Sequence, residues 1–361
     1  MSTEFVGSWR DVTHDIAGRD VARIGSKIDW QNTSISSFGL EYGSNLEYNY
    51  DIFLVSQDSR YESLQALSSI GGNLYARYPL VLNKINKKYL IEPIAQIAWG
   101  WREKSKVISD ESTHTEFDMG NLIKISRFAA SDRYEDGTHG AYGLRYSYNK
   151  TNSHRLEIGL GKVLRKKTHN GFTDSSGLNS VESDNYITST VHLPLNSYLS
   201  FQGLIDEKMA SKKTTFNGGF NYKKLDLDAE YSYLKPDPLE LRKMPVEEWT
   251  VSNHVKLNDK WNFNSNLRFD ETENHLAMLG AGVRYENQCV SVKLDLDRRY
   301  SQEGTSPPTT NFSFAINLKG FSTGRASGFS EHNCKETRCR IIILSTTILQ
   351  SVPLMLRVIT Q

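Results

Sequence analysis

The sequence predicts an all-β protein, an antiparallel up-and-down outer-membrane β-barrel that is incomplete and has roughly 16–17 strands of about ten residues each. Three observations support this prediction. Segments alternate apolar and polar side chains, the connections between them alternate in length, and aromatic residues collect near segment ends. Strands that cross a membrane with one face in lipid and the other in a barrel interior have these features.

Composition agrees with strands and excludes several classes of protein. A net charge of +1 indicates neither a basic nucleic-acid binder nor an acidic disordered chain. The 18 tyrosines and 25 glycines against 9 prolines favour strands. At 38% hydrophobic residues, the chain is too polar for a large core of fully buried strands, so we expect strands that are apolar on one face only.

Alternation with a period of two is clearest in the C-terminal half, where every second residue is apolar. The strands expected there include 225–233, 277–285, 290–296 and 311–319. Less regular strands are expected upstream, at 21–30, 38–54, 71–82 and 89–101. Pro93 and Pro194 are expected inside strands, where each removes a ladder hydrogen bond.

The connections add a second signal. Short turns are expected near 149–152, 196–197, 223–224, 258–259 and 287–288, and longer polar loops at 166–184, 235–247 and 301–310. Outer-membrane barrels have this rhythm, with short periplasmic turns and longer external loops. Aromatic residues near segment ends fit interfacial girdles; they are Trp99, Trp101, Trp249, Trp261, Tyr285 and Tyr300. A soluble β-sandwich with core aromatics is the alternative, but the regular change in loop length favours the barrel.

A charged segment contains Arg127, Asp132, Arg133, Glu135 and Asp136. These residues suit either a general acid–base site or an ion-pair cluster in a loop folded against the barrel interior. A catalytic site also needs a nucleophile or a metal within reach, and no motif indicates one. We therefore favour the ion-pair cluster, held by arginine–carboxylate bonds, and expect no catalytic, cofactor-binding or metal-binding residue and no enzyme activity.

Several short motifs occur in order between residues 9 and 324. They are YPLV (78–81), IEPIAQ (91–96), FD and NL (117–122), SRF (126–128), DR with the following acidic residue and glycine (132–137), YGLRY (142–146), the cysteine at 289, RRY (298–300) and NLKGF (317–321). Together they resemble the LPS-assembly outer-membrane protein family LptD, also called the organic-solvent-tolerance protein family. Composition and periodicity alone support only an outer-membrane barrel.

The resemblance implies a protein of Gram-negative envelope biogenesis that transports lipopolysaccharide and assembles it into the outer leaflet of the outer membrane. Its barrel opens laterally and does no covalent chemistry. The implied partners are lipopolysaccharide, a plug lipoprotein (LptE-like), a periplasmic bridge protein (LptA-like) and outer-membrane lipid. The alternative is a general or substrate-specific outer-membrane porin or channel. An outer-membrane hydrolase would require Ser, His and an acid converging at one rim.

The resemblance also implies roles for individual residues. The last strand would form one side of the lateral seam, through Phe312, Phe314, Ile316 and Leu318. Cys289 is a disulfide candidate, because the family has cysteines here that bond to a periplasmic jellyroll domain. Many members have an adjacent pair, whereas this chain has Gln288 beside a single cysteine. Lumen-facing cations such as Arg145, Lys293 and Lys319 could attract lipid A phosphates, although ordinary solvated lining is favoured for each.

We expect residues 1–324 to be the barrel portion, without the family's jellyroll domain and first strands. The first twenty residues contain no apolar run and so no signal peptide, which suggests truncation of an outer-membrane protein. Residues 325–361 lose the alternation, and we expect an aberrant or disordered tail that arises from a frameshift. Cys334 and Cys339 lie in that tail and receive no function.

Overall fold

A computed structural model describes residues 2–9, 13–16, 18–104, 108, 115–130, 132–151, 154–194, 196–240, 242–300 and 307–318. The expected tail at 325–361, with Cys334 and Cys339, lies outside the described residues, as does Lys319.

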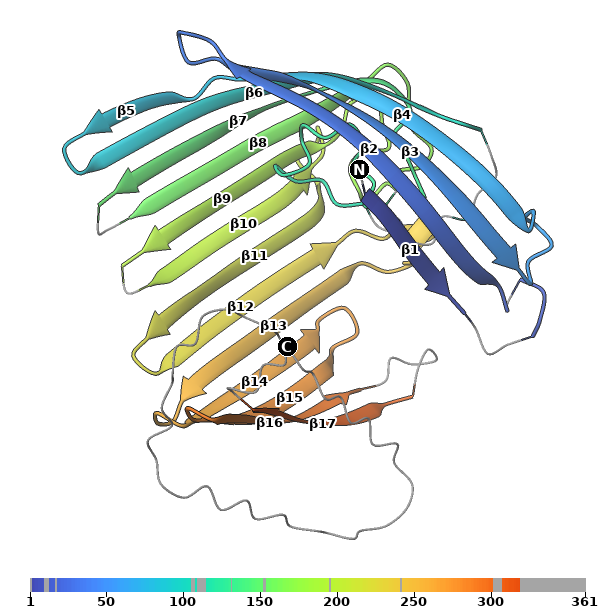
Figure 1. The fold of residues 1–361 in the computed structure, drawn as a ribbon. Helices are drawn as coiled ribbons and strands as arrows, with labels where there is room; N and C mark the ends of the chain where they lie inside the picture. Colours follow the sequence, from blue (N-terminus) through green and yellow to red (C-terminus); the bar gives the residue numbers. More distant parts are fainter. Residues whose placement is uncertain are drawn as a thin grey trace, which may run out of the picture. The chain divides into compact units, whose positions relative to one another are not determined.

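The described residues form seventeen strands in one sheet, and the registered neighbours are antiparallel (Figure 1), which confirms the predicted fold class. The strands are β1 (Ser2–Ser8), β2 (Asp20–Ile35), β3 (Glu41–Ser56), β4 (Leu64–Arg77), β5 (Leu80–Lys84), β6 (Lys87–Arg102), β7 (Gly137–Lys150), β8 (Arg155–Arg165), β9 (Asn185–Leu193), β10 (Ser197–Ile205), β11 (Ser211–Tyr222), β12 (Leu225–Leu234), β13 (Val246–Lys256), β14 (Trp261–Asp270), β15 (His275–Glu286), β16 (Val290–Arg299) and β17 (Thr309–Leu318). A 3-10 turn, η1 (Pro238–Glu240), lies between β12 and β13. Within the described residues, no helix is long and apolar enough to cross a membrane.

The chain divides into two compact units. Unit 1 comprises residues 1–218 and 231–247, and unit 2 comprises 219–230 and 248–361. In unit 1, adjacent strands pair in the order β1, β2, β3, β4, β6, β7, β8, β9 and β10. In unit 2, β13 to β17 pair consecutively.

Two of the expected strands are wrong in detail, the one at 71–82 and the one expected to contain Pro194. The single strand expected at 71–82 is two strands, because β4 ends at Arg77 and β5 begins at Leu80. Pro79, which has no N–H to donate, lies in the break, and the Tyr78 N–H donates to the Pro93 carbonyl at 3.1 Å. Pro93 lies inside β6 as expected, but Pro194 follows β9 and belongs to a turn.

The short turns predicted near 223–224, 258–259 and 287–288 are confirmed, because one strand ends before each of them and the next begins after it. The turns predicted near 149–152 and 196–197 include or adjoin residues outside the described ranges. The turn between β11 and β12 contains only Lys223 and Lys224, and Lys223 has a φ of 56°. The turn between β5 and β6 is equally tight, and Asn86 in it has a φ of 60°. Such left-handed conformations fit two-residue hairpin turns between twisted strands.

Exposure alternates along the strands of unit 1. On β6, Ile97 and Trp101 are 57% and 53% exposed, whereas Glu92 and Gln96 on the opposite face are 6% and 7% exposed. We call the face that carries Glu92 and Gln96 the inner face and the other the outer face. A soluble protein buries its apolar face, so the reverse arrangement indicates an outer face that contacts lipid.

The register aligns outer-face residues into rows across neighbouring strands. In unit 1, Tyr89 lies opposite Tyr148, with ring centroids 5.1 Å apart, near the short-turn end. Trp99 and Trp101 lie toward the other end of β6 and are exposed. In unit 2, Trp261 and Tyr285 are paired, with centroids 5.0 Å apart. These positions agree with the predicted aromatic girdles.

We predict that a charge in the middle of the outer face destabilises the protein more than a charge near the short turns. Leu144 lies opposite Pro93, between the levels of Tyr89 and Trp99 on β6. The substitution Leu144→Lys should reduce the free energy of unfolding in lipid vesicles by about 2–4 kcal/mol. Leu82→Lys, beside Tyr89, should cost about 0–1 kcal/mol. Urea unfolding of the refolded variants measures both, and equal costs would contradict a lipid-facing outer surface.

Candidate functional site

The inner face of unit 1 carries a chain of amide hydrogen bonds. Asn45 donates to Asn73 at 2.8 Å, and Asn73 donates to Gln96 at 2.9 Å, which links β3, β4 and β6. The same side chains bind the backbone of a long connection. Asn73 donates to the Ile123 carbonyl at 2.9 Å, and Gln96 donates to the carbonyls of Leu122 and Lys124 at 3.2 and 3.1 Å.

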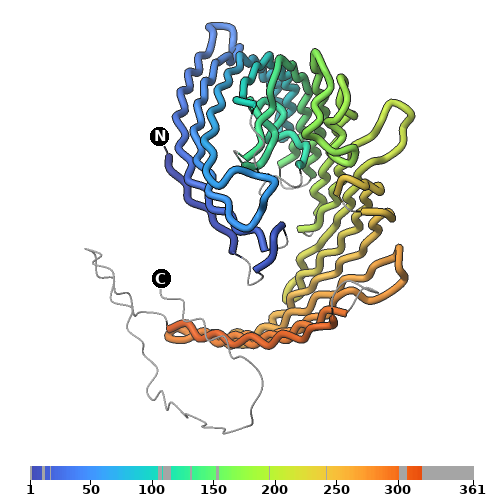
Figure 2. Tube along the Cα trace, turned by 90° about the vertical axis from the view of Figure 1, so that its right-hand side faces the viewer, coloured from blue at the N-terminus to red at the C-terminus, as the bar shows by residue number. Residues whose placement is uncertain are grey.

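We call residues 115–136 the first inner loop and residues 166–184 the second inner loop. The first connects β6 to β7 and the second connects β8 to β9. Figure 2 shows the first inner loop within the curve of the strands of unit 1. Its carbonyl groups replace water as acceptors for the inner-face amides, so both partners keep hydrogen bonds after burial.

Local hydrogen bonds shape the first inner loop where it starts. The Asn121 N–H donates to Asp118 Oδ1 at 2.8 Å, and the Asp118 N–H donates to Asn121 Oδ1 at 3.1 Å. Asn121 also donates to the Glu116 carbonyl at 2.6 Å. Asp and Asn side chains favour such turns because they bind backbone groups a few residues away.

Glu135 is the centre of the charged cluster. Its Oε2 accepts a hydrogen bond from Arg127 at 2.8 Å, and its Oε1 accepts from Arg165 Nε and Nη2 at 2.9 and 2.7 Å. The two arginines also donate to the Leu122 and Leu178 carbonyls, each at 2.9 Å. One buried carboxylate therefore joins both inner loops to β8.

The carboxyl group of Glu135 stays ionised despite complete burial. Desolvation on its own would raise the pKa of this carboxyl, but Arg127, His139 and Arg165 together outweigh that effect and lower the pKa to about 2. Among the described residues, neither arginine forms an ion pair with an acidic side chain other than Glu135. The cluster thus depends on one negative charge.

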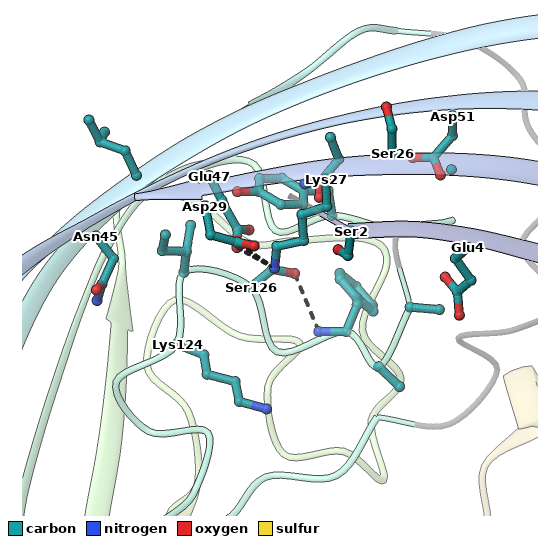
Figure 3. Close-up of a pocket in the computed structure, with 18 of the residues that line it drawn as sticks. Ser2, Glu4, Ser26, Lys27, Asp29, Asn45, Glu47, Asp51, Lys124 and Ser126 are labelled. Carbon is teal, nitrogen blue, oxygen red and sulfur yellow. Dashed lines mark hydrogen bonds and ion pairs between the residues drawn. The ribbon is translucent and has the colours of Figure 1, made fainter. Parts of the chain in front are cut away.

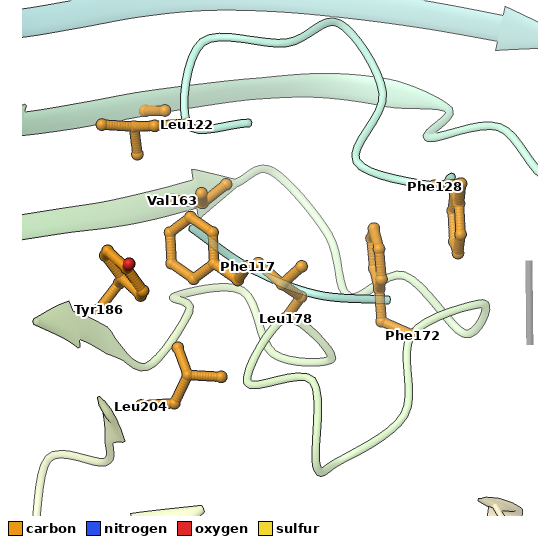
Figure 4. Close-up of a cluster of buried hydrophobic side chains, with 9 residues drawn as sticks. Phe117, Leu122, Phe128, Val163, Phe172, Leu178, Tyr186 and Leu204 are labelled. Carbon is orange, nitrogen blue, oxygen red and sulfur yellow. The ribbon is translucent and has the colours of Figure 1, made fainter. Parts of the chain in front are cut away.

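Figure 4 shows a cluster of buried apolar side chains. It lies beside the charged cluster, because Arg165 Cζ is 4.8 Å from the centroid of the Phe172 ring. Phe117, Leu122 and Phe128 belong to the first inner loop. The other members come from the second inner loop and the strands; they are Phe172, Leu178, Ala141, Val163, Tyr186 and Leu204. The rings of Phe128 and Phe172 stack with centroids 4.4 Å apart. Apolar contact therefore joins the two loops directly.

The second inner loop is also fixed at its far side. Asp174 forms ion pairs with Lys212 of β11 at 2.8 Å and with Lys235 at 3.0 Å. The Ser175 N–H donates to Asp237 Oδ2 at 2.8 Å, and the Ser175 hydroxyl donates to Glu240 at 2.6 Å. These bonds connect the loop to the segment that contains η1.

A cavity of about 1000 Å³ lies beside the first inner loop, against β1 to β4. Its lining carries equal numbers of acidic and basic side chains; the charged lining residues are Glu4, Arg23, Lys27, Asp29, Glu47, Asp51, Lys124 and Arg133. Arg23 pairs with Asp51 at 2.8 Å. Lys27 pairs with Glu47 at 2.9 Å and with Asp29 at 3.1 Å (Figure 3). This surface can form hydrogen bonds and ion pairs with polar and charged groups.

The residues of the sequence-predicted cluster have different contacts in the structure. Arg127 pairs with Glu135, whereas Arg133 donates to the Gly171 carbonyl at 3.1 Å and Asp132 is buried at 1% exposure. Asp136 lies near His169, with 2.8 Å between carboxylate oxygen and ring nitrogen. Arg165 was not predicted, because it ends a distant strand and carries no local sign of its partner.

The other candidate residues lie elsewhere. Cys289 lies just before β16, half-exposed, and its N–H donates to Asn287 Oδ1 at 2.9 Å. The four seam candidates on β17 are exposed; they are Phe312, Phe314, Ile316 and Leu318. The disulfide and seam roles stay predictions. Of the suggested lumen cations, Arg145 pairs with Glu92 at 3.3 Å and Lys293 with Asp295 at 2.9 Å.

Among the described residues, one group has donor atoms close enough to hold a metal ion. Asp270, Glu273 and His275, at the turn between β14 and β15, have donors within 4.8 Å of one another. Asp270 is buried and Glu273 is exposed. Two carboxylates and one imidazole suit several divalent ions, so the donor set alone selects none.

We predict that Glu135→Gln releases the first inner loop. The substitution leaves two buried arginines without their carboxylate, which should cost about 3–5 kcal/mol. Hydrogen exchange should accelerate over residues 115–136 and stay unchanged in β2 and β3. Asp136→Asn is the matched control, because Asp136 is 63% exposed and its pair with His169 is worth about 0–1 kcal/mol. Equal exchange in the two variants would contradict the central role of Glu135.

Acid should weaken the docking of this loop. The folded-state pKa of Glu135 lies below its ordinary value of 4.5, at about 2, so its stabilisation is complete above the ordinary value and is lost as pH falls toward the folded one. The stabilisation at stake is about 3 kcal/mol. Pepsin cleavage within the first inner loop should therefore rise over this range, with Asp136→Asn behaving as the native chain. Protection that is independent of pH in this window would refute the ionised state of Glu135.

Comparison with known proteins identifies the family. No curated protein matches the sequence. Among solved structures, the copper transporter OprC aligns with a TM-score of 0.40 and 12% identity over 83% of this chain, and the chain spans 58% of its length. A mutant of the Rh. blastica porin aligns with a TM-score of 0.35 and 8% identity, over 83% of this chain and 91% of the porin. Similarity at this level supports no argument about this chain.

The family model for LptD, LPS transport system D, matches residues 1–261, which is more than half of the sequence. The chain therefore belongs to the LptD family.

Proposed function

We propose that this chain transports lipopolysaccharide and assembles it into the outer leaflet of the outer membrane, within a β-barrel that opens laterally. The observation that carries the proposal is the family match over residues 1–261. The exposed face of the strands is apolar and their buried face is polar. This arrangement supports an outer-membrane location.

The charged cavity of unit 1 suits the polar part of such a substrate. Lipopolysaccharide combines a phosphorylated, sugar-rich head with acyl chains. Its phosphates can form charge-assisted hydrogen bonds with Lys124 and Arg133, which line the cavity. Moving these groups through hydrocarbon would be costly, so the head needs a polar route while the acyl chains need contact with lipid. Lateral opening satisfies both requirements.

The proposal includes partners and a seam. β17 would form one side of the lateral opening, with Phe312, Phe314, Ile316 and Leu318 beside the emerging acyl chains. A plug lipoprotein (LptE-like) would occupy part of the interior, and a periplasmic bridge protein (LptA-like) would deliver the substrate. Transport of this kind breaks and forms no covalent bond, so the chain would act without enzyme activity.

A general or substrate-specific channel is the second candidate. The cavity of about 1000 Å³ with a balanced charged lining favours it, because such a surface also suits water and small solutes. The two inner loops have different consequences for the two candidate functions. In a channel, solutes or ions must pass the loops. A lipid transporter needs them only to shape the route of the head group.

We predict that a photo-crosslinking amino acid at Lys124, in the cavity, forms adducts with lipopolysaccharide in living cells. The same amino acid at Leu82, on the outer face near the short turns, should not, because that position is expected to contact the periplasmic leaflet. Adducts are detected by a lipopolysaccharide-specific antibody after irradiation. If the folded protein gave no adduct at Lys124 but conducted ions in planar bilayers, the channel would replace the proposed function.

A further inference from the structure

The outer face of unit 1 carries a row of three lysines near the short turns. Lys84 of β5 lies opposite Lys87 of β6, and Lys87 lies opposite Lys150 of β7. We call these residues the lysine row. A backbone bond from the Thr151 N–H to the Asn86 carbonyl, at 3.1 Å, holds the two adjacent turns together.

This arrangement is unfavourable for the protein alone. Directly opposed residues on antiparallel strands have Cβ atoms roughly 4.5–5.5 Å apart, and like charges at that separation repel. All three lysines are exposed, and none forms an ion pair with an acidic side chain among the described residues. An external anion would offset this repulsion.

The neighbouring rows on the same face are apolar or aromatic. One outer-face position further along each strand, about 7 Å away, the register aligns Leu82, Tyr89 and Tyr148. The next row contains Leu80, Ile91 and Tyr146. Cations at the rim, tyrosines beneath them and aliphatic groups beyond follow the polarity of a membrane from head group to acyl chain.

The charged residues next to the lysine row lie on the inner face, so they do not pair with the three lysines. Lys88 and Asn149, one residue from the lysine row, face inward, and so does Arg155, which pairs with Glu157. The outer face of β5 to β7 from the lysine row to Pro93 carries no carboxylate, so no acidic group of these rows can neutralise the lysines.

We infer that the lysine row is a binding site for the head group of an anionic phospholipid in the leaflet at the short-turn end. The phosphate would accept charge-assisted hydrogen bonds from the ammonium groups, and the acyl chains would lie against the tyrosines and aliphatic residues below. A soluble acidic protein fits less well, because the rows beneath the lysines are apolar. In an outer-membrane barrel the short turns face the periplasm, so the leaflet is the periplasmic one.

Native mass spectrometry of the refolded full-length chain in a neutral detergent tests this site. The native chain should retain dioleoylphosphatidylglycerol over dioleoylphosphatidylcholine by about tenfold or more, because each lysine near an anionic surface strengthens binding by roughly fivefold. The variant K84Q/K87Q/K150Q should lose that preference. The control K88Q/K208Q/K243Q makes the same change in net charge at exposed positions outside the row, and it should keep the preference.

Three further measurements test whether charge and apolar contact both contribute to binding. K84R/K87R/K150R should retain binding, which separates charge from folding defects, and high salt should release phosphatidylglycerol from the native chain. Glycerophosphoglycerol, the head group without acyl chains, should compete poorly if the apolar rows contribute. Equal retention of both lipids by the native chain, or an equal loss in the glutamine variant and its control, would overturn the site. This experiment does not measure lipopolysaccharide transport. A result that overturns the lipid site would therefore leave the proposed function unaffected.

Discussion

The carboxylate of Glu135 holds together parts of unit 1 that lie far apart in sequence. It binds Arg127 of the first inner loop and Arg165 at the end of β8, and each arginine also binds a loop carbonyl. Removal of these charges from water is costly, and the cost is recovered only because every group keeps several partners at close range. The position of both loops depends on this arrangement, and so does the shape of the cavity beside the first inner loop.

The strands make that interior possible. Their outer faces are apolar and exposed, which directs amides such as Asn73 and Gln96 inward. These amides then bind the backbone of a loop that would otherwise carry unpaired carbonyl groups. The inner surface is thus polar in two ways, through fixed hydrogen bonds under the loop and through charged side chains around the cavity. Passage of a charged lipid head along such a surface avoids the desolvation that hydrocarbon would impose.

The two faces carry cations for different purposes. On the inner side, Arg23 and Lys27 have carboxylate partners, so they shape the cavity without a strong net field. On the outer side, the lysine row lies directly above tyrosines and has no carboxylate in its rows. In the proposed site, the charge of the lysine row has its complement outside the chain, in the membrane, and would help to fix the height of these strands in the bilayer.

By itself, the sequence determined the class of fold, the short turns and the aromatic levels, because period-two alternation and turn chemistry are local. It also placed Arg127 and Glu135 in one charged segment, and its motifs indicated the family. Only the tertiary structure decided that Arg165 completes the cluster and that Asn73 and Gln96 hold the loop, since these partners lie on strands remote in sequence. The break between β4 and β5 and the alignment of Lys84, Lys87 and Lys150 also required it. Register decides which side chains face each other, and a single strand does not reveal its register.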